Sequence, residues 1–449
     1  MTTRFLAAAL GALVLAGAGA PAVAQPQPAP AAASPAFNRI PAAERARALD
    51  EIRAIVAKFY VFPERRAAII ERLTQAQAAG RYDLDDPFAF ASAISADLAA
   101  ASHDRHMYIN VDPVQYAAAT APSASDDGSG QGNAFWRNLA LENNHGLTEM
   151  KVLPGNVRYL KLAPFYWVDD ESGRAYDDAM RFLRGGEAVI IDLRGNGGGN
   201  GAGVQYLTSH FLAPDTLLQT FHLRGEAPAQ SRTLFNVPAG RLIGKPLYVL
   251  IDGGVASAGE EFAYHVEQFH LGELIGATTA GAANNNELMP VAPGFILSVS
   301  TGRPVHAISG TNWEGVGVAP TIATPPAQAL EVAQSRALAR LAASDTATAE
   351  QKARYSWLQQ TIEAKLHPVT LAPGRMKALA GRYGEQVVTF HDGALWLARG
   401  ERPERRLIPL AADGLFLIEG ADLLRVRLTG SALELVRPGG APPSRFARG

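Results

Sequence analysis

The stretch LYVLIDGGVASAGEEFAYHVEQF, residues 247–269, predicts a strand, a tight turn and a helix in direct succession. Its first five residues are a continuous apolar run before Asp252, which is typical of a strand buried on both faces of a sheet. Glycines favour the turn, and 259–269 has helical character. A second apolar run, 188–193, also contains an acid near its end and precedes a predicted helix at 201–212. Strands that alternate with helices indicate a layered α/β domain.

Shifts in composition divide the chain into predicted segments. Apolar residues at helical spacing favour a small all-α subdomain near the N-terminus, and short apolar runs separated by turn residues favour a small antiparallel β domain at the C-terminus. A low-complexity stretch separates the α-helical part from the α/β part. The predicted segments are a helical subdomain at 37–111, a connecting loop at 112–155, the α/β domain at 156–345, a helix at 346–368 and the β domain at 369–449.

The first 24 residues have the pattern of a secretory signal peptide. Arg4 provides the positive start, 5–19 is an apolar run of 15 residues, and Ala22-Val23-Ala24 fits the small-x-small cleavage rule. A Pro/Ala linker follows at 25–36. We therefore expect an exported protein, periplasmic or secreted, and no later segment is long and apolar enough to predict a membrane span.

Charge and composition exclude several classes of function. The chain has 449 residues, with 41 Lys and Arg against 43 Asp and Glu, a net charge of −2. This balance argues against nucleic acid as a partner. With no cysteine, the chain has no disulfide framework, thiolate zinc site or cysteine nucleophile. No H-E-x-x-H motif occurs, so no metal and no other cofactor is predicted.

Three segments have the residue types of a catalytic site. Ser257 lies where the predicted helix begins, next to backbone N–H groups that favour a developing oxyanion. From this segment alone, a simple N-cap is the more frequent role for such a serine. The glycine-rich run DLRGNGGGN, 192–200, lets backbone N–H groups approach a ligand. The segment NWEGVGVAP, 312–320, places Glu314 in a turn, where an exposed loop glutamate is the alternative.

A serine nucleophile needs a base, and the base needs a group that orients it. The chain has ten histidines. Those of the predicted helix after Ser257, His265 and His270, point away along it. Spacing alone does not decide among the others, which include His103, His106, His210 and His306.

Five motifs, in order, resemble those of a known family of serine peptidases. The family includes the C-terminal-processing (tail-specific) proteases, the tricorn protease core and the interphotoreceptor retinoid-binding protein modules. The resemblance covers about 40–325. The matching motifs are DRH at 104–106, VIIDLRGNGGG at 189–199, ASAGE at 256–260, GATTAG at 276–281 and WEGVGV at 313–318.

The resemblance implies a fold and a set of roles. The fold would be a layered ClpP/crotonase-like α/β catalytic domain. Ser257 would be the nucleophile, His106 the base and Glu314 the residue that orients it. The backbone N–H groups of Ala258 and Gly198 would form the oxyanion hole. The substrates would be peptides or proteins, hydrolysed through an acyl-enzyme.

This sequence departs from its relatives at several points. Ala282 occupies the position where the processing proteases have a lysine base, so the chain is closer to the tricorn-like branch. Arg105 stands where that branch has a serine before the histidine. The segment 112–155 is too short for the PDZ domain of the processing proteases.

Two other functions fit the same resemblance. Because the retinoid-binding modules share the fold, a non-catalytic module that binds a hydrophobic ligand is the main alternative. An assembly role of the β domain at 369–449 is a third, and the oligomeric state is not predicted.

Overall fold

The computed structural model describes residues 37–120, 131–439 and 442–449. The predicted signal peptide and the Pro/Ala linker lie outside the described residues. No helix among the described residues has both the length and the apolar character that crossing a membrane requires.

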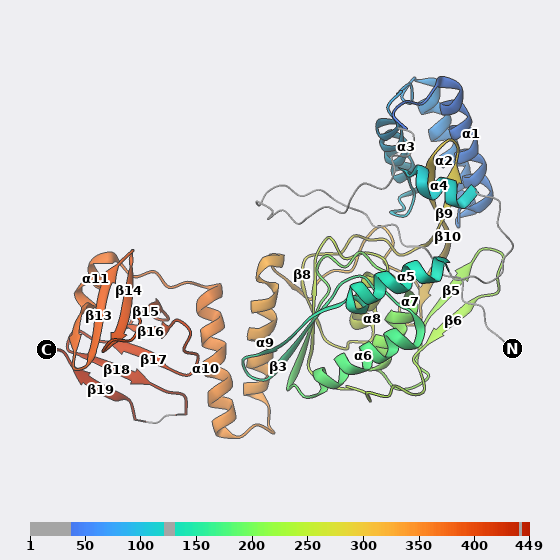
Figure 1. Ribbon diagram of the computed structural model, residues 1–449. Helices are drawn as coiled ribbons and strands as arrows, with labels where there is room; N and C mark the ends of the chain where they lie inside the picture. The colour runs from blue at the N-terminus through green and yellow to red at the C-terminus, as the bar shows by residue number, and fades with distance from the viewer. Residues whose placement is uncertain (1–36, 121–130, 440–441) are drawn as a thin grey trace.

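A six-stranded sheet forms the centre of the α/β part (Figure 1). Its strand order is β11-β8-β7-β4-β3-β2, and all neighbours are parallel except β2 and β3. The strands are β2 (Leu147–Leu153), β3 (Val157–Leu162), β4 (Ala188–Asp192), β7 (Leu247–Ile251), β8 (Glu273–Gly276) and β11 (Ile322–Ala323).

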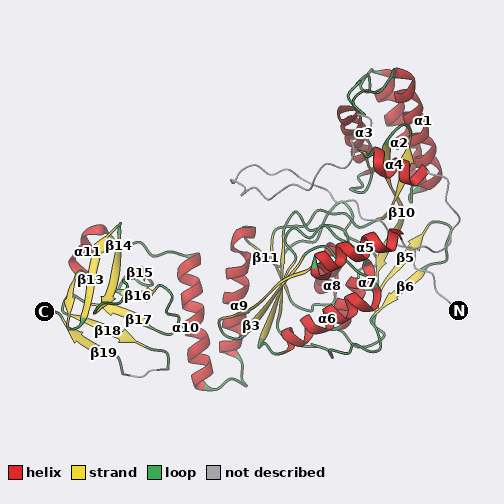
Figure 2. Ribbon diagram, in the orientation of Figure 1, coloured by secondary structure: helices red, strands yellow, loops and turns green. Residues whose placement is uncertain are grey.

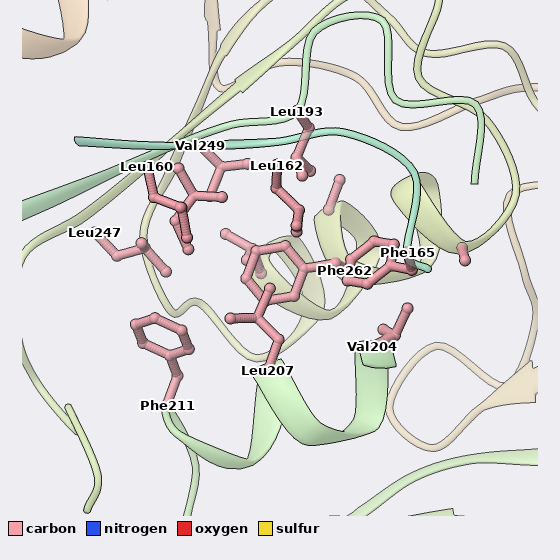
Figure 3. Close-up of a cluster of buried hydrophobic side chains, with 14 of the residues drawn as sticks. Leu160, Leu162, Phe165, Leu193, Val204, Leu207, Phe211, Leu247, Val249 and Phe262 are labelled. Atoms are coloured by element: carbon pink, nitrogen blue, oxygen red, sulfur yellow. The ribbon is translucent and has the colours of Figure 1, made fainter. Parts of the chain in front are cut away.

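Helices cover both faces of this sheet, which explains the unbroken apolar runs of β4 and β7. One core packs against α6 (Asp169–Arg184), α7 (Gly201–Ser209) and α8 (Ala258–Gln268). Figure 3 shows Phe262 of α8 in this core, among strand residues such as Leu160 and Val249. On the opposite face, α9 (Ala329–Ala343) and α10 (Ala349–Leu366) complete a second core.

The N-terminal part is helical up to Ser102, as expected, and strands from elsewhere in the chain complete its core. Helices α1 (Ala42–Phe59), α2 (Pro63–Ala78) and α3 (Pro87–Ser102) pack against a second sheet of order β1-β10-β5-β6, with β9 also paired to β10. The three helices leave an apolar face, and Phe295 and Leu297 of β10 cover it. The other strands are β1 (Tyr108–Val111), β5 (Leu217–Leu223), β6 (Ala229–Arg232), β9 (Asn285–Val291) and β10 (Phe295–His306).

The segment expected as a connecting loop, 112–155, contains regular structure. It includes α4 (Pro113–Thr120), α5 (Gln131–Glu142), a single 3₁₀ turn and β2. Strand β2 forms because it pairs antiparallel with β3 across a tight turn and buries Leu147 in the core.

The C-terminal part is an antiparallel sheet of eight strands in sequential order (Figure 2). Helix α11 (Pro373–Leu379) precedes it. The expected fold class, a layered α/β domain with an N-terminal helical part and a C-terminal β domain, is confirmed. The strands are β12 (Gly381–Tyr383), β13 (Gln386–His391), β14 (Ala394–Arg399), β15 (Arg405–Pro409), β16 (Leu415–Ile418), β17 (Arg425–Leu428), β18 (Ala432–Val436) and β19 (Ser444–Ala447).

Candidate active site

Ser257 lies in the turn between β7 and α8, in a strained backbone conformation. Its φ is 51° and its ψ is −121°, a region that residues other than glycine rarely adopt. The glycine-rich loop after β4 passes close to it. A Cβ atom at Gly198 would lie 2.8 Å from Cβ of Ser257, so this approach requires glycine. The half-buried serine therefore faces the backbone of that loop.

Glu260, in the first turn of α8, holds this turn in place. Its fully buried carboxylate accepts hydrogen bonds from the N–H of Ser257 at 3.0 Å, of Gly281 at 2.6 Å and of Ala282 at 2.7 Å. The hydroxyl of Thr279 donates a fourth. Burial raises the pKa of Glu260, while these donors lower it. No role was predicted for Glu260 from the sequence, although its position three residues after an N-cap serine is a known capping pattern.

The two predicted oxyanion donors differ in their availability. Among the described residues, the N–H of Ala258 has no hydrogen-bond acceptor, as expected at the first position of a helix. The N–H of Gly198 already donates to Oδ1 of Asn196 at 2.9 Å. Gly198 is therefore beside Ser257 as expected, but its N–H is not free in this conformation.

Asn196 joins the glycine-rich loop to its surroundings. It is fully buried, and its side-chain amide donates to the carbonyls of Leu162 at 3.2 Å and Ala163 at 2.7 Å. Its own carbonyl accepts from the N–H of Ala256 at 2.9 Å. One side chain and one peptide group thus connect the end of β3 to the turn that presents Ser257. The asparagine was part of a recognised motif, but nothing in the sequence indicated these contacts.

His106 lies just after α3 in a turn stabilised by Asp104. The buried carboxylate of Asp104 accepts the N–H of His106 at 2.9 Å, and the carbonyl of His106 accepts the hydroxyl of Ser298 on β10. Nδ1 of His106 is buried and has no hydrogen-bond partner among the described residues. Burial lowers the pKa of His106, and the negative charge of Asp104 opposes that shift. The imidazole is therefore held in its neutral form, the form that a general base requires.

Glu314 lies on the other side of the same cluster. Oε1 accepts the N–H of Arg105 at 3.0 Å, and Oε2 accepts those of Ala283 at 2.6 Å and Asn284 at 2.8 Å. Burial and the charge of Asp104 raise the pKa of Glu314 to about 7, against the effect of these donors.

Asp104, His106 and Glu314 each place one ligand-type atom within 4.8 Å of the others. They form the one group among the described residues with metal-ligand spacing. Both carboxylates are already supplied with hydrogen-bond donors, because the side chain of Asn284 donates to Asp104 at 3.0 Å and backbone N–H groups donate to Glu314. The arrangement suits an acid–base cluster around His106.

The segment 279–284 connects the serine to this cluster. Ala282 donates its N–H to Glu260, which holds the Ser257 turn, and the next residue, Ala283, donates to Glu314. Two neighbouring peptide groups therefore bind the two carboxylates. Among the described residues, no hydrogen bond joins the side chains of Ser257 and His106 directly.

The other candidate histidines are placed elsewhere. His103 is an exposed residue with left-handed conformation at the end of α3. His306 is buried and its Nε2 lies 3.1 Å from Nδ1 of His265. His210 is buried and its Nδ1 lies 2.9 Å from the carbonyl of Tyr206. Of the four histidines that spacing left open, His106 is the one next to Glu314.

A family model and two curated proteins match part of this chain. The model of peptidase family S41 matches residues 156–324. The carboxy-terminal processing protease CtpB of Bacillus subtilis is 26% identical over 180 residues, which cover 39% of this chain and 35% of that protein. The carboxy-terminal-processing protease of Bartonella bacilliformis is 30% identical over 137 residues, 30% of either chain. The matched segment thus spans about a third of either relative.

Solved structures with similar folds include two proteases. The photosystem II D1 C-terminal processing protease is 16% identical, with a TM-score of 0.39, and the match covers 68% of this chain and 98% of that one. The tricorn protease is 12% identical, with a TM-score of 0.42, and the match covers 65% of this chain and 35% of that one. The part of this chain at 156–324 is thus similar to the domains of peptidase family S41.

Proposed function

We propose that this protein is a serine endopeptidase that hydrolyses peptide bonds through an acyl-enzyme. The observation that supports it most directly is the segment 279–284, which connects the carboxylate of the Ser257 turn to the carboxylate beside His106. This arrangement couples the position of the nucleophile to that of the base. A serine that merely capped a helix would not need such a connection.

In the proposed acylation step, His106 takes the proton from the hydroxyl of Ser257 as the oxygen attacks the substrate carbonyl. The imidazolium that forms is offset by the negative charge of Glu314. His106 then gives its proton to the leaving amine as the peptide bond breaks. Water attacks the acyl-enzyme in the second half of the reaction, with His106 again as the base.

The oxyanion needs hydrogen-bond donors, and the N–H of Ala258 is the first of them in this proposal. Gly198 supplies the second once its N–H turns from Asn196 toward the oxyanion. Losing one such donor typically lowers kcat by ~10²–10³-fold.

The substrates in this proposal are peptides or proteins, and the site of action is the periplasm or the exterior of the cell. The proposed site of action rests on the signal-peptide pattern of residues 1–24.

A fluorophosphonate probe tests the proposed nucleophile. We would label the purified chain and measure the intact mass of the wild type, Ser257→Ala, His106→Ala and a control, Ser344→Ala, in the connection between α9 and α10. A single adduct on the wild type and the control, absent from Ser257→Ala and strongly slowed in His106→Ala, is expected. Equal labelling of Ser257→Ala would refute the assignment, and no labelling of folded protein would favour the hydrophobic-ligand alternative.

A further inference from the structure

A basic pocket of about 270 Å³ opens beside β10, at the junction of the helical part and the β5–β6 hairpin. Three arginines and a histidine line it: Arg66, Arg224, Arg303 and His222. Glu226 is the one carboxylate among its lining residues. Such a concentration of positive charge stands out in a chain whose net charge is −2.

Strand β10 contributes Arg303 to this pocket and holds two other lining segments through backbone hydrogen bonds. The carbonyl of Ser300 accepts the N–H of Val61 at 2.8 Å, and the carbonyl of Thr301 accepts the N–H of Arg224 at 3.1 Å. Arg303 is directly opposite His222 in the ladder between β10 and β5. Segments from three distant parts of the sequence therefore bring their basic side chains together beside β10.

The three guanidinium groups of the pocket are held in place by contacts that do not neutralise their positive charge. Arg224 lies over the ring of Phe59 at 4.6 Å, and Arg303 lies 5.8 Å from the ring of Phe62. Arg66 donates to the carbonyl of Tyr60 through two nitrogens. Within the described part of the chain, none of the three arginines forms an ion pair. Aromatic rings and a carbonyl orient these cations but leave their charge available for an anionic ligand.

We propose that this pocket binds an acidic stretch of the polypeptide substrate, an inference that rests on the proposed peptidase function. Ser298 on β10 donates to the carbonyl of His106, and Arg303 lies five residues further along the same strand, about 17 Å away at the rise of a strand. An extended substrate of five or six residues spans that distance. A substrate that extends along β10 from the proposed base would therefore bring carboxylates to the guanidinium groups.

The shape of the pocket favours a peptide over a membrane surface. It is a concave site, and Leu223 and Val61 contribute apolar side chains to its lining. A peptide offers both carboxylates and apolar side chains to such a site, whereas a bilayer surface meets a flat basic face more readily. Lipid phosphate is therefore the competing ligand in the test.

Binding to the Ser257→Ala variant tests the pocket without relying on catalysis. The probes are a fluorescent 12-residue peptide containing five glutamates, the same peptide with glutamines, and vesicles of phosphatidylglycerol. We expect the glutamate peptide to bind more tightly, and the double variant Arg224→Glu/Arg303→Glu to weaken it by about tenfold or more. The control Arg354→Glu, an exposed arginine on α10, should leave binding unchanged.

A gain-of-function variant guards against loss of fold. Glu226→Gln removes the one carboxylate of the pocket, so it should tighten binding of the glutamate peptide. Equal binding of both peptides would overturn the inference. So would unchanged binding of the glutamate peptide in both the double variant and Glu226→Gln. Vesicle binding that needs the arginines, without peptide binding, would assign the pocket to lipid phosphate instead. None of these outcomes depends on the fluorophosphonate result, so the two proposals fail separately.

Discussion

The backbone N–H of Arg105 donates a 3.0 Å hydrogen bond to Oε1 of Glu314, which lies 209 positions later in the chain. The side chain of Arg105 is exposed, so the peptide group provides the contact and the residue type does not. The tricorn-like branch that the sequence resembles has a serine at this position. In this protein, a backbone donor holds the carboxylate next to His106, which shows how an arginine is accommodated there.

Glu314 should set the acid limb of the pH–activity profile. Burial and Asp104 raise its pKa to about 7, whereas burial lowers that of His106. The active form, with neutral His106 and ionised Glu314, therefore forms as the pH rises through about 7. Glu314→Gln should lower kcat/KM by ~10²-fold and remove this limb. A pH–rate profile of the variant that kept the limb near pH 7 would assign it to another group.

The same shift predicts how stability changes with pH. Folding raises the pKa of Glu314 from its usual 4.5, so the folded state binds the proton more tightly than the unfolded state. This contribution to stability is fully present below about pH 4.5 and is lost as the pH rises through about 7. Urea denaturation at pH 5 and pH 8 should show a smaller difference for Glu314→Gln than for the wild type. An unchanged difference would contradict the raised pKa.

Asp104→Asn should move the acid limb to lower pH. The negative charge of Asp104 contributes to the high pKa of Glu314, so its removal lets Glu314 ionise more readily. The introduced amide oxygen can still accept the N–H of His106, as Asp104 does at 2.9 Å. Comparison of the pH–rate profiles with that of Asp112→Asn, outside the cluster, would isolate the effect of the charge. A limb that stayed in place would show that Asp104 does not act on Glu314.

Gly198→Ala should abolish activity. Its control, Gly197→Ala, should leave the melting temperature unchanged. A Cβ at Gly198 would meet Cβ of Ser257 at 2.8 Å and the carbonyl of Ala256 at 3.1 Å, and its φ of 115° disfavours any other residue. A Cβ at Gly197 meets nothing within 4 Å. Probe labelling and thermal denaturation of both variants check this. An active Gly198→Ala variant would mean that the loop and the serine turn do not need their close approach.

The sequence predicted the parts of the site that depend on local pattern. The apolar runs of β4 and β7 are recognisable because both faces of their sheet are covered. The turn of Ser257 follows one of them directly. His106 could be chosen among the histidines only through the family resemblance, because its proximity to Glu314 arises from tertiary contacts.

Other features escaped prediction for physical reasons. Glu260, Asn196 and Asp104 act by accepting from or donating to backbone groups. The capping pattern could have indicated the contact of Glu260 with Ser257, but no side-chain pattern reveals which distant peptide groups will be near. Strand β10 belongs to a sheet that also completes the helical subdomain, so the packing of α1–α3 depends on residues about 200 positions away. The boundary drawn at composition shifts could not show this pairing.

Glu260→Ala should destabilise the protein and disorder the Ser257 turn together. The substitution leaves the N–H groups of Ser257, Gly281 and Ala282 buried without their acceptor. We expect a loss of about 3–5 kcal/mol in the free energy of unfolding. The control Glu267→Ala, on the same helix but half-buried, should cost about 0.5 kcal/mol or less. If the denaturation curves of the two variants matched, Glu260 would not have the positioning role assigned to it.

Arg425 should determine whether the C-terminal β domain stays docked on α10. Its guanidinium lies 3.7 Å from the ring centroid of Trp357 and donates to Gln360 at 2.6 Å, and burial lowers its pKa to about 10, so it remains charged at neutral pH. Arg425→Ala removes a desolvated cation–π contact and leaves the side-chain oxygen of Gln360 without this donor. We expect the free energy of unfolding to fall by about 2–4 kcal/mol.

Arg427 on the same strand is the matched control. Its ion pair with Asp413 is partly exposed, and such pairs contribute about 0–1 kcal/mol. Limited proteolysis of the link between α10 and α11, together with tryptophan fluorescence during urea unfolding, would compare Arg425→Ala with Arg427→Ala. Early cleavage and a separate low-urea transition in Arg425→Ala alone are expected, because the contact with Trp357 joins β17 to α10. Equal resistance of the two variants would show that the remaining contacts hold the domain without Arg425.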